Sequence, residues 1–81
     1  MISVEVTFFA QLKDFFGEKI SIELPQGTAL AEIRNILARQ NALAFDWLKI
    51  SRFASENAFL AEDFKVVAGG RYFFLPPSSG G

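Results

Sequence analysis

The last two residues, Gly80 and Gly81, are the part of the sequence with the clearest chemical use. Glycine has no Cβ, so a glycine segment can carry a terminal carboxylate into a channel that is too narrow for any side chain. That carboxylate is inert as it stands. It becomes an acyl or sulfur donor only after activation, normally as an acyl-adenylate that another enzyme makes with ATP. The plainer alternative is a frayed terminus, which is what most glycine-rich chain ends are.

The residue types that are missing exclude most other chemistry. The 81 residues include no Cys and no His. Disulfides, thiolate catalysis, imidazole general bases and the usual zinc and iron ligands are therefore absent. The neighbouring carboxylates Glu62 and Asp63 lie in a predicted turn, where we expect them to face solvent. The sequence predicts no bound metal or cofactor, and it does not support an independent enzyme with its own active site.

Charge and hydropathy restrict the partners. Eight basic and nine acidic residues give a formal charge of −1, with no run of either sign. Phosphate binding needs clustered Lys and Arg, so nucleic acid is not an expected partner. The sequence shows neither a basic leader followed by a long apolar run nor a stretch long enough to span a bilayer. We expect a cytoplasmic protein with no membrane partner.

The elements that must position the chain end begin with a hairpin. Apolar residues alternate with polar ones over residues 2–8 and 20–24, which predicts two strands joined by a wide loop. Thr28 is a predicted N-cap of a helix that ends near Asn41. Leu30, Ile33 and Leu37 lie at helical spacing and are expected to pack against the sheet.

The second half of the chain is expected to complete the sheet. Residues 42–48 are interpreted as a connector, and four extended stretches are predicted at residues 49–54, 58–60, 64–67 and 71–75. The order of elements predicts an α+β fold of the β-grasp, ubiquitin-like type, with a mixed sheet packed on one helix. The length suits a single domain.

We assign residues 1–75 to that domain and residues 76–81 to an extended, flexible C-terminal tail. Pro76 and Pro77 cannot donate ladder hydrogen bonds, and the four residues after them have no apolar side chain to pack.

Large apolar residues occur where a strand should face outward. Phe9 is out of phase with the first strand, and the consecutive residues Phe73, Phe74 and Leu75 cannot all point inward. An exposed apolar patch beside the tail is therefore predicted as a partner interface, formed by Phe9, Phe59, Phe74, Leu75, Pro76 and Pro77. The alternative is that the sheet curls and loops cover these rings. Five basic residues are expected to be solvated only: Arg34, Arg39, Lys49, Arg52 and Arg71.

Over its full length the sequence resembles MoaD, the small subunit of molybdopterin synthase, within the MoaD and ThiS group of sulfur carriers. The resemblance rests on residues 8–11, on the turn at Gly70 and above all on residues 74–81. It implies that an E1-like, MoeB-like enzyme adenylates Gly81 with ATP, and that sulfur from a donor protein converts it to a thiocarboxylate. In a MoaE-like large subunit, the sulfur then passes to cyclic pyranopterin monophosphate. Gly80 would be the thin segment behind the reactive carbon.

Two departures from the family pattern affect the expected partner contacts rather than the tail. Family members often have Gly-Asp where this chain has Gly70 and Arg71, and often a Val-Asn pair near residues 55–57.

Two alternative functions stay open. One is a ThiS-like carrier for thiazole or another metabolite, and the other is a ubiquitin-like modifier that forms isopeptide bonds through the same activated Gly81.

Overall fold

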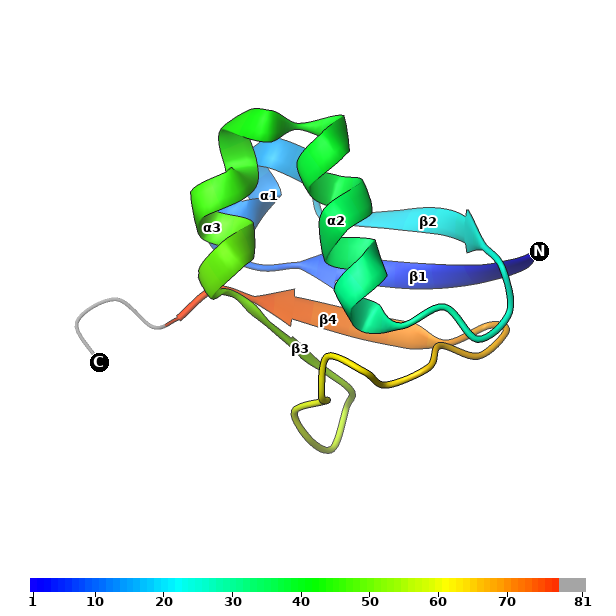
Figure 1. The fold of residues 1–81 in the computed structure, drawn as a ribbon. Coiled ribbons are helices and arrows are strands. Elements are labelled where there is room, and N and C mark those ends of the chain that lie inside the picture. Colours follow the sequence, from blue (N-terminus) through cyan, green and yellow to red (C-terminus); the bar gives the residue numbers. More distant parts are fainter. Residues whose placement is uncertain (78–81) are drawn as a thin grey trace.

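Helices cover one face of a four-stranded sheet in the computed structural model, which describes residues 1–77 (Figure 1). Its elements, in chain order, are β1 (Ile2–Phe8), α1 (Leu12–Phe16), β2 (Lys19–Leu24), α2 (Leu30–Gln40), the 3₁₀ turn η1 (Ala42–Ala44), α3 (Phe45–Ile50), β3 (Arg52–Ala54) and β4 (Arg71–Leu75). Within these residues, no helix is long and apolar enough to cross a membrane.

The sheet has the mixed topology that the sequence predicts. Its strand order is β2-β1-β4-β3. The outer pairs, β1 with β2 and β3 with β4, are antiparallel, whereas the central pair, β1 with β4, is parallel. Parallel neighbours need a crossover connection, and α2 lies within that crossover over the sheet (Figure 1). The predicted β-grasp fold is confirmed, and the last strand is a central one.

The core lies between the sheet and α2. Leu30, Ile33 and Leu37 are fully buried, as the helical spacing predicts. From the sheet, Phe53 of β3 and Phe74 of β4 stack with their ring centroids 4.0 Å apart. With no Cys or His in the chain, apolar packing of this kind carries the stability of the domain.

The predicted connector at residues 42–48 is wrong, because this stretch is mostly helical. The side chain of Asn41 accepts a hydrogen bond from the Leu43 N–H and starts η1, and α3 follows. Ala44 and Leu48, four residues apart, are both buried. The predicted third strand is correspondingly shorter, because residues 49 and 50 belong to α3.

Three smaller expectations also differ from the structure. Residues 58–60 and 64–67 form only isolated bridges in the described chain, Ala54 with Phe59 and Ala29 with Lys65. The short helix α1 was not predicted. Thr28 does not cap α2, because its hydroxyl donates to the Pro25 carbonyl at 2.6 Å and Ala29 is the N-cap residue.

Leu37→Ala should lower the free energy of unfolding by about 2–5 kcal/mol, because the side chain is fully buried and its removal leaves a cavity. Urea denaturation measures the effect. Gln40→Ala, an exposed position on the same helix, is the control and should change stability by less than about 0.5 kcal/mol. Similar losses for both variants would contradict the packing of this helix face.

Candidate functional site

The segment that leads to the tail leaves from the middle of the sheet. Leu75, the last residue of β4, pairs with Arg52 of β3, and Phe74 pairs with Phe8 of β1 and with Phe53 of β3. Neighbours on both sides therefore fix the end of β4. Gly80 and Gly81, the predicted reactive end, lie outside the described residues.

A hollow of about 270 Å³ lies beside this exit, and we call it the tail-exit hollow. Its lining comes from α3, β3, the loop after β3 and the end of β4: Ile50, Arg52, Phe59, Leu75, Pro76 and Pro77. Ile50 and Phe59 are at least half exposed. Four of the six predicted interface residues, Phe59, Leu75, Pro76 and Pro77, thus line a single surface feature.

Phe9 and Phe73 form a second apolar contact near the end of the sheet. Their rings meet edge to face with centroids 5.9 Å apart. Phe9 is 39% exposed, and Phe73 is half-buried. Phe73 and Leu75 lie on the same face of β4, because alternate residues of a strand point the same way. The outward phase predicted for Phe9 agrees with this placement.

Phe74 was predicted for the interface, and the structure places it in the core instead. It is fully buried and stacks on Phe53. Tyr72 is buried on the same face of β4, so Phe73 and Leu75 take the opposite face. The Phe74 ring packs in the core beneath this surface, so a partner cannot contact it in this fold.

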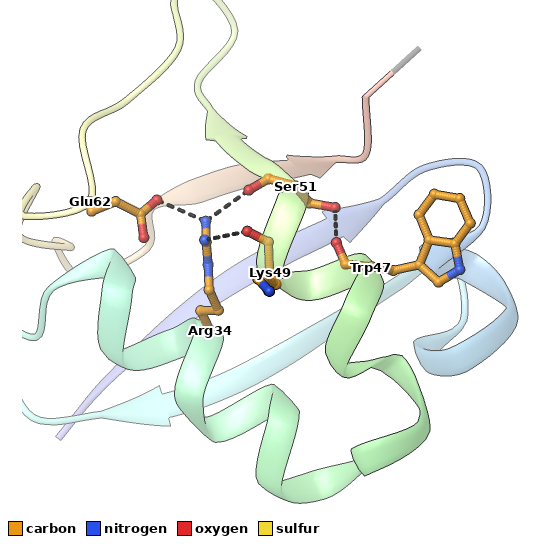
Figure 2. A network of polar contacts seen from close by, with 5 residues as sticks. All are labelled: Arg34, Trp47, Lys49, Ser51 and Glu62. Carbon is orange, nitrogen blue, oxygen red and sulfur yellow. Dashed lines mark hydrogen bonds and ion pairs between the residues drawn. The ribbon is translucent and has the colours of Figure 1, made fainter. Parts of the chain in front are cut away.

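A polar network, the Arg34 network, ties α2 to the corner between α3 and β3 (Figure 2). The Arg34 guanidinium donates to the Ser51 carbonyl at 2.8 Å, to the Lys49 carbonyl at 3.3 Å and to a Glu62 carboxylate oxygen at 2.8 Å. The two carbonyls flank Ile50, which lines the tail-exit hollow. The network therefore holds this wall of the hollow against α2.

The expectation that Arg34 is only solvated is wrong. Its guanidinium carbon lies 5.7 Å and 5.5 Å from the ring centroids of Phe53 and Phe74, within the range of a cation–π contact. The sequence did hold a signal for this placement. Arg34 follows Leu30 by four residues and precedes Leu37 by three, which puts it beside the apolar stripe of the helix.

The turn before β4 depends on two adjacent glycines for different reasons. Gly69 has a φ of 73°, a conformation that favours glycine. At Gly70, a Cβ would come within 2.7 Å of Cζ of Tyr72. The Tyr72 hydroxyl accepts a hydrogen bond from the Val67 N–H at 3.1 Å. Gly70 thus leaves room for the ring that closes the start of the last strand.

Arg34→Met should lower the free energy of unfolding by about 1–3 kcal/mol, because it removes the hydrogen bonds to two carbonyls of the α3–β3 corner. Amide hydrogen exchange at that corner should become faster. Arg39→Met is the matched control on α2. Its ion pair with Glu32 is exposed and should contribute less than about 0.5 kcal/mol. Equal effects of the two variants would show that the Arg34 network does not hold the corner.

Comparison with solved structures identifies the fold. No protein-family model and no curated protein matches the sequence. Among solved structures, subunit 1 of the molybdopterin-converting factor from Helicobacter pylori, in complex with subunit 2, is 25% identical, with a TM-score of 0.70 over 99% of this chain and 100% of that chain. A putative molybdopterin converting factor subunit 1 from Pyrococcus furiosus is 18% identical, with a TM-score of 0.78 over 96% of this chain and 100% of that one.

Small archaeal modifier protein 1 from Haloferax volcanii is 17% identical, with a TM-score of 0.77 over 98% of this chain and 99% of that chain. This chain has the ubiquitin-like β-grasp fold. The resemblance to the MoaD group is confirmed in the fold. Two of these three neighbours are first subunits of molybdopterin-converting factors and the third is a small modifier protein, and the Helicobacter pylori subunit is seen in complex with subunit 2.

Proposed function

We propose that this protein is the sulfur-carrier subunit of a molybdopterin synthase and has no catalytic site of its own. The observation that carries the proposal is a terminal Gly80-Gly81 pair a few residues beyond a central strand of a β-grasp body. The full-length similarity to subunit 1 of the Helicobacter pylori complex supports the pterin pathway over other uses of such a tail.

The chemistry takes place at the Gly81 carboxylate and in the active sites of partners. In an E1-like adenylating enzyme, a carboxylate oxygen attacks the α-phosphate of ATP and pyrophosphate leaves. The outer sulfur of a persulfide on a donor protein then attacks the acyl-adenylate, so that AMP leaves and an acyl disulfide forms. A second thiol of the partner proteins cleaves that disulfide, which releases the thiocarboxylate and leaves a disulfide between the two partner sulfurs. In the large subunit, the sulfur passes to cyclic pyranopterin monophosphate and water restores the carboxylate. This chain contributes the reactive carbon and a Gly80 segment thin enough to enter the partner.

The apolar surface around the tail exit is proposed to dock on the large subunit. It comprises the Phe9–Phe73 contact and the tail-exit hollow. Exposed apolar side chains gathered around one feature are typical of protein interfaces, and this surface lies beside the segment that the partner must receive. Docking here would aim the tail into the partner's active site.

A second candidate function is a ubiquitin-like protein modifier, which the similarity to small archaeal modifier protein 1 favours. It would use the same adenylated Gly81, but a target lysine amine would attack it and form an isopeptide bond. Conjugates with other proteins that disappear when Gly81 is deleted would favour the modifier. Molybdopterin formation that requires the chain would favour the sulfur carrier.

Deleting Gly81, or adding one residue after it, should abolish molybdopterin formation. Deletion moves the reactive carbon back by one residue, and extension buries it in a peptide bond. Ser78→Ala, which keeps the length and the chain end, is the control and should support normal formation. Both altered chains should keep the wild-type Tm, because residues 1–77 are unchanged. Synthase reconstituted with the large subunit provides the assay, and activity of the chain without Gly81 would exclude the sulfur-carrier role.

Phe9→Asp should weaken complex formation with the large subunit by roughly tenfold to a hundredfold, because it places a charge within the apolar surface. The fold should persist, since the ring is already 39% exposed. Leu43→Asp is the matched control. Leu43 is 85% exposed and lies in η1. The affinity of the Leu43→Asp variant for the large subunit should therefore stay within about twofold of wild type. If Phe9→Asp bound like wild type in a titration, docking through this surface would be refuted.

A further inference from the structure

Arg52 is an exposed cation at the rim of the tail-exit hollow. Its guanidinium carbon lies 4.0 Å from the ring centroid of Phe59, so the charged group is stacked on the ring. Three ion pairs form among residues 1–77, namely Lys19 with Glu5, Arg34 with Glu62 and Arg39 with Glu32, and Arg52 takes part in none of them.

The acidic residue of the following loop that forms an ion pair in the described chain does so with another arginine. Glu62 lies in the loop between β3 and β4, and its carboxylate accepts from Arg34 at 2.8 Å. The Arg52 guanidinium lies over the Phe59 ring, the residue is exposed, and among residues 1–77 it forms no ion pair that would occupy its N–H groups. A planar guanidinium held in this way is suited to bind a carboxylate with two parallel hydrogen bonds.

The rest of the hollow is apolar. Ile50, Phe59, Leu75 and the two prolines line it, and among residues 1–77 Arg52 is the one charged residue in the lining. The chemistry that complements this lining is an apolar side chain next to a carboxylate. Arg52 pairs with Leu75 in the sheet and its guanidinium lies over the Phe59 ring, so part of its conformational freedom is already lost before a partner binds.

Chain length places the receiving enzyme close to this hollow. Pro77 lines the hollow, Gly81 follows it by four residues, and four residues of fully extended chain span at most about 14 Å. An enzyme that holds the Gly81 carbon in its active site must therefore have its surface close to Arg52.

We propose that Arg52 binds a carboxylate of the large synthase subunit when that subunit receives the tail, while an apolar side chain beside the carboxylate enters the tail-exit hollow. The inference rests on the proposed function, and it adds the charge that selects the partner. The large subunit is the committed partner because a neighbour of this chain is seen in complex with its subunit 2. Arg52 is thus a specificity residue, in contrast to the solvated role that its sequence context predicts.

The test compares Arg52→Glu with Arg71→Glu in titrations against the large subunit of the same organism. Both arginines are exposed and both changes reverse one charge, but Arg71 is at the opposite end of β4 from the tail exit. Arg52→Glu should weaken binding by about tenfold or more at low salt, because two carboxylates would face each other. Arg71→Glu should stay within about twofold of wild type. The loss should shrink when salt is raised to about 0.5 M, and Arg52→Lys should restore part of the affinity.

The outcomes separate this inference from the function on which it rests. If wild-type protein does not bind the large subunit, the proposed function fails and the inference fails with it. If wild type binds and the two reversals weaken binding equally, only net charge matters and the role of Arg52 is refuted. If Arg52→Glu binds the large subunit normally but is no longer adenylated by the E1-like enzyme, the carboxylate belongs to that enzyme and the inference is overturned.

Discussion

The placement of β4 between β1 and β3 is the constraint on which the rest of the structure depends. One strand completes the sheet, supplies a core ring and leads to the chain end. Phe74 makes this possible because it is fully buried against Phe53, which anchors the strand one residue before Leu75 and the prolines. In a domain with no disulfide and no His or Cys ligand, apolar anchoring of this kind provides a fixed starting point for the tail.

The body and the chain end have different tasks under the proposed function. The body presents a surface and fixes the point of exit, whereas Gly81 supplies the reactive carbon and partner enzymes supply the chemistry. Arg34 links the helix layer to that surface, since its guanidinium binds the α3–β3 corner and lies over the rings of Phe53 and Phe74. The same side chain therefore supports the core ring that anchors β4 and the corner that presents Ile50 and Arg52.

Periodicity in the sequence was sufficient to predict the hairpin, the buried face of α2 and the β-grasp fold. It was insufficient to predict α3, because Phe45–Ile50 is too short to show a helical repeat. Phe74 was misplaced because three consecutive apolar residues do not reveal which of them face inward, and pairing with Phe8 and Phe53 decides this. Arg34 was expected to be solvated because its hydrogen-bond partners, Lys49, Ser51 and Glu62, are remote in sequence. The roles of Gly80 and Gly81 stay predictions, since these residues lie outside the described part of the chain.

The most direct test of the central claim is the mass of the protein after activation. The intact chain is incubated with its adenylating enzyme, ATP and a sulfur source, and its mass is then measured. A sulfur carrier should show the exchange of one terminal oxygen for sulfur, and fragmentation should place the change at Gly81. If the mass stays unchanged while a known carrier is converted under the same conditions, the sulfur-carrier function is contradicted.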